Sequence, residues 1–206
     1  MRRPGSRATA VKLFASVVLV GGAASVAALG TYGSFTSTTS ASENVSTGKV
    51  VLNSAAGVRG LSVDATNLVP GDTVQRTVTL SRSTADTDSF GSVKLTTTAT
   101  TNNVLTSDAT NGLQLKVDQC SVAWTKPANS NDLQCSGSTT TVVAQRAVLG
   151  QNIDLAAANT TLNAAGATSH LRTTLTLPTN ADNTFQGLSN TINFVFDGTQ
   201  RAAEAR

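Results

Sequence analysis

His170 is the only histidine in the chain, and it limits the acid–base and metal chemistry that the sequence can support. A zinc protease of the HExxH type needs two histidines at helical spacing and a glutamate as general base. The only glutamates are Glu43 and Glu204, so this site cannot be formed. A Ser-His-Asp triad could use His170, but the sequence has no GxSxG motif and His170 precedes an alternating strand. We therefore expect a surface histidine and predict no catalytic residue.

An acidic loop in the middle of the chain partly matches a calcium-binding loop. Asp86, Asp88 and Gly91 occupy positions one, three and six of that pattern. Phe90 and Thr97 stand where an oxygen ligand and a bidentate glutamate are needed, so the pattern fails at two ligands. We expect a solvated turn, with loose calcium binding around the two aspartates left open. We predict no metal site and no cofactor.

Cys120 and Cys135 are the two cysteines, and they lack the CxxC spacing of redox sites and zinc ribbons. In an exported protein such a pair most often forms a disulfide. Closing a loop of this length within one chain contributes about 3 kcal/mol in the chain-entropy model. The sequence does not show whether the bond closes within one chain. Trp124 follows in the same segment and could stack on a sugar, although a core or strand-end position is the commoner role.

The first 30 residues have the three parts of a secretory signal peptide. Cations but no acids precede position 13, residues 13–29 are uncharged and mostly apolar, and small residues follow. We expect cleavage between about residues 30 and 33, before Thr31 or before Ser34. A retained anchor is the alternative, but this run of 17 residues is short for a stable span of about 20.

Cleavage there would change the charge of the protein. The whole chain has 15 Lys and Arg against 12 Asp and Glu, and the signal contains four of the cations. The remaining 11 cations against 12 acids give a net charge of −1. We therefore expect no nucleic-acid binding and no attraction to anionic lipid, and we expect no stable membrane span after cleavage.

The rest of the chain has the alternation of apolar and polar residues that is typical of β-strands. The clearest segments are 74–80, 93–99, 113–124, 171–177 and 192–196. We expect seven to nine strands, with at most a helical turn in 144–158, and therefore an all-β antiparallel jelly roll or β-sandwich. The domains expected are the signal, 1–30; an N-terminal segment, 31–48; one β-sandwich, 49–198; and a polar tail, 199–206.

Several short motifs occur in a fixed order along the exported part of the chain. They are Phe35 after the small residues of the signal, Gly48 before a strand, Pro70-Gly71 before an alternating strand, Leu177-Pro178, and Gln186-Gly187-Leu188. In this order and spacing the chain resembles the TasA/camelysin (CalY-like) family of exported bacterial proteins. The Cys120–Cys135 pair departs from the simplest pattern of that family.

The resemblance implies a jelly-roll domain, a signal processed by a SipW-type peptidase, and a place at the cell surface or in the extracellular matrix. Some members assemble into fibres in which the N-terminal segment of one subunit completes the sheet of the next. The matching segment here is about Ser34 to Asn53, which makes 31–48 a candidate donor strand. Camelysin relatives are described as metalloendopeptidases, and the residues of this chain do not support that mechanism.

These observations favour a secreted structural, matrix or cell-surface protein of the TasA type, with a self-associating fibre subunit as the specific form. Two alternatives remain open at this stage. One is a camelysin-like metalloendopeptidase. The other is an extracellular module that binds glycans or proteins, with Trp124 and the disulfide loop as its contact region.

Overall fold

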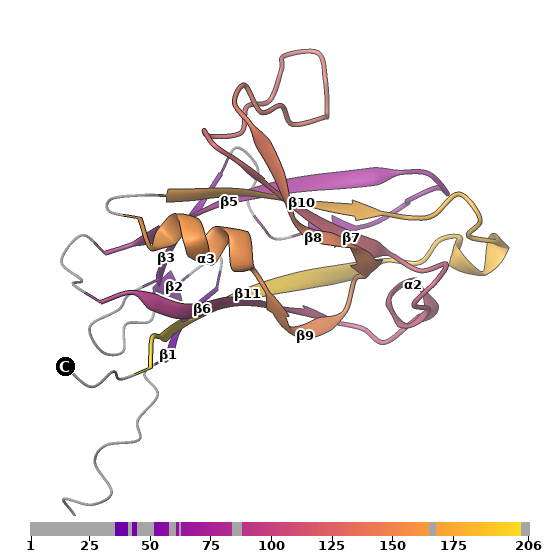
Figure 1. Cartoon of the computed structure of the whole chain (residues 1–206). Helices are drawn as coiled ribbons and strands as arrows, with labels where there is room; N and C mark the ends of the chain where they lie inside the picture. The colour runs from indigo at the N-terminus through magenta and orange to yellow at the C-terminus, as the bar shows by residue number, and fades with distance from the viewer. Residues whose placement is uncertain are drawn as a thin grey trace, which may run out of the picture. The chain divides into compact units, whose positions relative to one another are not determined.

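Figure 1 shows the computed structural model of the chain. The described residues are 36–40, 43–44, 52–57, 61, 63–83, 88–164 and 168–202. The expected signal peptide lies outside them, as do most of residues 31–48. The described residues form two antiparallel sheets with few helices, so the predicted all-β sandwich is confirmed.

Sheet A has the strand order β2-β1-β11-β6-β9, and β4 also pairs with β11. Its strands are β1 (Thr36–Ser40), β2 (Glu43–Asn44), β4 (Val63–Ala65), β6 (Phe90–Ala99), β9 (Gly150–Asp154) and β11 (Asn190–Gln200). The central strand β11 is continuous over eleven residues and ends two residues beyond the expected end of the sandwich. The short strand β4 begins at Val63.

Sheet B has the strand order β3-β5-β10-β7-β8. Its strands are β3 (Leu52–Ala56), β5 (Thr73–Arg82), β7 (Gln114–Cys120), β8 (Thr139–Ala147) and β10 (Thr168–Thr176). In Figure 1 this sheet lies above sheet A, and a long loop rises from its outer face. That loop is residues 121–138, which we call the excursion.

The two inner faces enclose one apolar core, because alternate residues of each strand point inward. Phe194 and Phe196 of β11 are buried from sheet A, and Leu171 and Leu175 of β10 are buried from sheet B. Each of these residues belongs to an alternating segment recognised in the sequence. Periodicity of two therefore identified the core strands correctly.

In the part of the chain that the structure describes, three short helices join the sheets: α2 (Val104–Ser107), α3 (Ala156–Leu162) and the 3-10 helix η1 (Asn183–Phe185). The helical turn expected in 144–158 begins only at Ala156, because β8 and β9 occupy most of that range. Ala158 and Leu162 of α3 are buried in the core between the sheets. Figure 1 shows α3 crossing the side of the sandwich, while α2 and η1 lie at one end.

The strand expected to run through Trp124 is wrong, because β7 ends at Cys120. After Cys120 the chain leaves the sheet, and Ser121 donates a hydrogen bond to Ser138 at the base of the excursion (3.0 Å). Val122 is 41% exposed, although the alternating pattern placed it on a strand. The alternation of apolar residues in the sequence therefore extends beyond Cys120, where the strand itself ends and the chain leaves the sheet.

Candidate functional site

The excursion is attached to the outer face of sheet B at a small second core. Cys120 and Cys135 form the expected disulfide, and the bond closes within one chain. Trp124 and Leu133 pack against it, and both are buried. The excursion thus covers part of a sheet face that the sequence pattern assigned to solvent.

Arg172 is the centre of the contacts under the excursion. Its guanidinium carbon lies 4.2 Å from the centre of the Trp124 ring, which is cation–π geometry. One terminal nitrogen donates to the carbonyl oxygen of Leu133 (3.0 Å), and the other donates to a carboxylate oxygen of Asp118 (2.9 Å). A single side chain of β10 therefore holds the excursion and neutralises a carboxylate of β7.

Asp118 is almost completely buried, with 1% of its side chain exposed. Burial alone would raise the pKa of this carboxyl, but hydrogen bonds from Arg172, Lys116 and Thr141 lower it below its ordinary value. The group is therefore ionised at neutral pH and paired with cations. Its chemistry is that of a structural ion pair, since no oxygen is left facing solvent.

Gln75 of β5 provides a further attachment for the excursion. Its side-chain oxygen accepts a hydrogen bond from the backbone N–H of Leu133 (2.7 Å), while Arg172 donates to the carbonyl of the same residue. Both backbone polar groups of Leu133 are thus bonded to side chains of the sheet. Sequence reasoning missed Gln75, Arg172 and Asp118, because a polar residue at an outward strand position carries no local signal.

Trp124 does not form an exposed sugar-stacking platform. The side chain is 5% exposed, and its indole N–H donates to the carbonyl oxygen of His170 (2.9 Å). One face of the ring is covered by Arg172. The ring is in the second core, which is the commoner of the two roles considered for Trp124, and the alternative of an exposed stacking surface does not fit its burial.

His170 lies on the outer face of β10, opposite Thr79 of β5 and Cys120 of β7. The Nδ1 atom is 3.1 Å from the hydroxyl of Thr79, and the Nε2 atom is 3.1 Å from the hydroxyl of Thr168. Both ring nitrogens are therefore in contact with hydroxyl groups. Neither nitrogen has a carboxylate partner among these contacts, so the geometry lacks the orienting acid of a catalytic triad.

Burial lowers the pKa of His170 below its ordinary value. The unfolded chain then binds a proton more readily than the folded chain, so stability falls as the pH drops below the unfolded value of about 6.5. The loss levels off once the pH is below the folded pKa. Between pH 7 and pH 5, we expect the free energy of unfolding in urea to fall slightly more for the wild type than for His170→Gln. An equal fall in both proteins would contradict this expectation.

The calcium-loop pattern does not form a calcium-binding loop. Its fifth residue, Phe90, is buried, and the hydroxyl of Thr97 donates to the carbonyl of Val148 (2.6 Å) within the sandwich. The second half of the pattern is strand β6 instead of a loop. Asp88 accepts a hydrogen bond from Gln200 (2.9 Å), and Asp86 lies outside the described residues.

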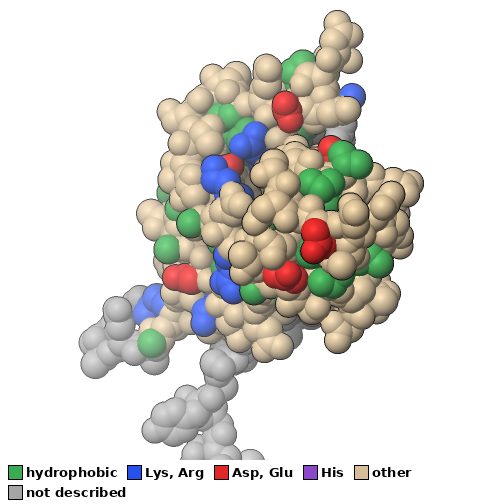
Figure 2. Space-filling view, turned by 90° about the vertical axis from the view of Figure 1, so that its right-hand side faces the viewer, with side chains coloured by type: hydrophobic (Ala, Val, Ile, Leu, Met, Phe, Trp, Pro, Cys, Tyr) green, Lys and Arg blue, Asp and Glu red, His purple; other side chains and the backbone are tan. Residues whose placement is uncertain are grey.

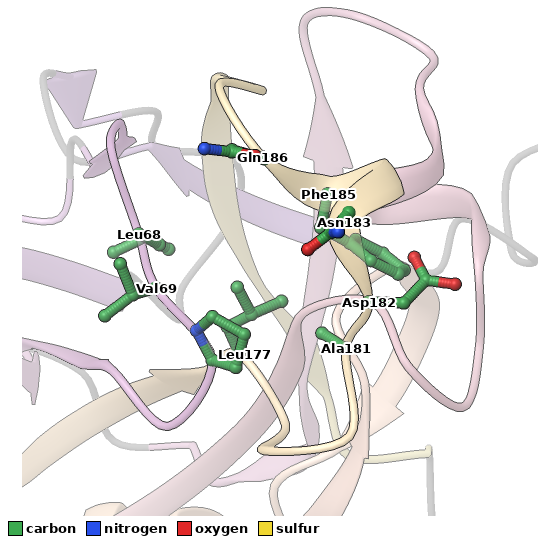
Figure 3. A pocket seen from close by; sticks show the side chains of 9 residues that line it. Leu68, Val69, Leu177, Ala181, Asp182, Asn183, Phe185 and Gln186 are labelled. Atoms are coloured by element: carbon green, nitrogen blue, oxygen red, sulfur yellow. The ribbon is translucent and has the colours of Figure 1, made fainter.

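A pocket of about 240 Å³ lies at the end of the sandwich that carries η1, and we call it the end pocket. Figure 3 shows Leu68 and Val69 on one side and Phe185 with its neighbours in η1 on the other. Its lining residues are Leu68, Val69, Pro70, Leu177, Ala181, Asp182, Asn183, Phe185 and Gln186. The apolar residues dominate this lining, and polar side chains stand on the η1 side.

Two distant sequence motifs meet at the end pocket. The backbone N–H of Gly71 donates to the carbonyl of Leu177 (2.8 Å), and the N–H of Leu177 donates to the carbonyl of Asp72 (3.0 Å). Gly71 has φ = 98°, a conformation that glycine adopts without strain. The Pro70-Gly71 turn and the Leu177-Pro178 motif thus form one rigid wall.

The sequence model of the camelysin metallo-endopeptidase family matches residues 10–205, which is nearly the whole chain. The chain belongs to the TasA/camelysin family. None of the curated proteins compared with the chain matches it. The resemblance recognised from the ordered motifs is therefore confirmed at the level of the family.

The family description implies a metal, and a metal needs several ligand side chains close together. Within the described ranges, no three His, Cys, Asp or Glu side chains are grouped closely enough to hold a metal ion. His170 faces two threonine hydroxyls, and Asp118 is paired with two cations. A cation would be repelled from Asp118 and would find no second strong ligand at His170, so these residues do not fit a catalytic metal.

Among the described residues, no helix is both long enough and apolar enough to cross a membrane.

Proposed function

We propose that this camelysin-family chain is an extracellular structural protein that assembles with copies of itself by exchanging strand β1. Proteins of this family are extracellular or attached to the cell surface. A disulfide-stapled sandwich with a buried ion pair suits that environment. The endopeptidase activity named in the family description is not part of the proposal, because the described side chains do not fit a metal.

The pairing of β1 with β11 supports this proposal. Residues Thr36–Ser40 pair antiparallel with Val195–Thr199 on one edge of β11, and β4 occupies Asn190–Ile192 on the same edge. The other edge of β11 pairs with β6 along most of its length. If β1 leaves, the five residues Val195–Thr199 of β11 lose their partner strand. An unpaired strand edge of this kind is a template for pairing with another chain.

A second copy can supply an identical strand to that edge at little energetic cost, because every hydrogen bond lost in one copy is regained in the other. Such an exchange links copies head to tail. If the rotation from one copy to the next does not close a ring, the assembly grows as an open filament. Assembly through β1 is therefore a form of β-augmentation in which the added strand comes from the same protein.

A cysteine pair across the β1–β11 register tests the exchange. Thr38 and Asp197 are partners, so Thr38→Cys/Asp197→Cys in the exported chain from Thr31 onward permits a bond between the two strands. With exchange, oxidation at rising protein concentration yields covalent ladders on a non-reducing gel, because the two cysteines belong to different copies. Electron microscopy of the same samples checks whether the ladders correspond to fibres.

A matched control uses two strands that stay within one copy. Thr98 and Asn193 are partners on β6 and β11, and both are exposed on sheet A. Thr98→Cys/Asn193→Cys must give closed monomers under every condition. If the β1–β11 pair also gives only closed monomers at all concentrations, β1 is not exchanged and the proposal is wrong.

A further inference from the structure

The end pocket is built to receive an apolar group, and the described residues leave it open. Val69 on its wall is 59% exposed, the highest exposure among the large hydrophobic residues that the structure describes as exposed. A cavity of about 150 Å³ lined by apolar side chains is large enough to bind benzene. At about 240 Å³, the end pocket has room for one aromatic side chain.

The aromatic residues of the exported chain point to what fills it. Five of them lie within the described residues, and all five are buried: Phe90, Trp124, Phe185, Phe194 and Phe196. The other two, in a chain cleaved before Thr31, are Tyr32 and Phe35, which shortly precede β1 in the sequence. The aromatic side chains that the core does not use are thus concentrated within four residues.

These two residues cannot reach the end pocket of their own chain while β1 is paired in it. Thr36 pairs with Thr199 at one end of β11, whereas the end pocket lies beyond Asn190 at the other end. Nine residues of strand separate these ends, or about 30 Å at 3.4 Å per residue. Residues 31–35 span at most about 17 Å when fully extended.

Figure 1 shows the same separation, with the end of β11 on one side and η1 on the other. Figure 2 looks onto the η1 end, where hydrophobic side chains are visible at the surface between polar ones. Thr36, the first described residue of β1, lies at the end of β11 that is opposite the end pocket. In a head-to-tail stack, that end of one copy faces the end pocket of the next copy.

We propose that the end pocket binds the segment Tyr32–Phe35 of a second copy of this chain, with one aromatic ring inserted between Val69 and Phe185. The inference rests on the self-assembly proposed above and adds a second contact to it. Because the donor and acceptor surfaces differ, the interface is heterologous and repeats along one axis. A buried aromatic anchor in a well-formed pocket is the usual source of binding energy in such contacts.

Mixing two chains that each carry one added cysteine beside the native disulfide tests the contact. Exported chains with Ser34→Cys, which keep both aromatic rings, are mixed with chains with Val69→Cys, oxidised, and digested, and mass spectrometry identifies the crosslinked peptides. A bond between positions 34 and 69 can then form only between copies. Val122→Cys in place of Val69→Cys is the matched control, because Val122 is an exposed valine on the excursion. We expect at least about tenfold more of the 34–69 peptide than of the 34–122 peptide, since docking raises the effective concentration to the millimolar range.

Filling the pocket gives a second measurement that leaves the cysteines in place. Ala181 lines the pocket, so Ala181→Phe should reduce the 34–69 crosslink severalfold while the interchain 38–197 crosslink persists. If 38–197 ladders form but the 34–69 yield does not exceed the 34–122 yield, this inference is overturned and strand exchange stands. If the 34–69 crosslink forms without the ladders, copies dock through the pocket and strand exchange is overturned. If neither forms, both proposals are overturned.

Discussion

Replacing Arg172 with leucine is expected to lower the free energy of unfolding by about 3 kcal/mol, because it leaves the buried carboxylate of Asp118 without its main partner. Removing one member of a buried ion pair costs 3–5 kcal/mol in general, and Lys116, 2.9 Å from Asp118, keeps this case at the lower end. The variant also loses the contact with Trp124 and the hydrogen bond to Leu133. Urea unfolding followed by the fluorescence of Trp124, the only tryptophan, measures the change.

Two further variants separate charge from geometry. Arg172→Lys keeps the cation but cannot bond Leu133 and Asp118 from one planar group, so an intermediate loss is expected. Arg146→Leu is the matched control, because Arg146 is an exposed arginine on β8 and should change stability by less than about 0.5 kcal/mol. Equal stability of Arg172→Leu and Arg146→Leu would show that the pair with Asp118 contributes nothing.

The sandwich could be predicted from the sequence because its core is encoded locally. Leu171 and Leu175 of β10, and Phe194 and Phe196 of β11, occupy alternate positions, and each is buried. Thr-rich outward positions fit the same pattern. Within such segments the inward and outward positions follow from the strand period, and no long-range information is needed.

The second core could not be predicted in this way, because its contacts join distant segments. Arg172 and Asp118 are 54 residues apart, and Gln75 and Leu133 are 58 apart. Each residue alone fits an ordinary polar position on a wet sheet face. Only the pairing of β10 with both β5 and β7 brings them under the excursion.

The end pocket shows a third relation between sequence and structure. The Pro70-Gly71 and Leu177-Pro178 motifs belong to the ordered set of motifs on which the family resemblance rests. The sequence did not show that they bond to each other through Gly71 and Leu177 or that they frame a pocket. Motifs that serve as markers of a family can therefore have a shared physical role that only the tertiary structure reveals.

Breaking the disulfide by Cys135→Ala is expected to lower the free energy of unfolding by about 3 kcal/mol, the chain-entropy value for a loop of about 15 residues. The cysteines are 15 residues apart, so the estimate applies directly. The native excursion should remain in place, because Gln75, Arg172 and the indole N–H of Trp124 hold it by hydrogen bonds. The loss then arises mainly in the unfolded chain, which gains freedom.

The size of the stability loss does not show whether it arises in the unfolded chain, but two further measurements do. In urea the midpoint should fall and the dependence on urea should steepen, because a less restricted unfolded chain exposes more surface. The fluorescence maximum of Trp124 in the folded variant should stay at the wild-type position, and wild-type protein treated with a reductant is the matched control. A red-shifted maximum before unfolding would contradict this account, since it would mean that the hydrogen bonds from sheet B cannot hold the excursion without the covalent link.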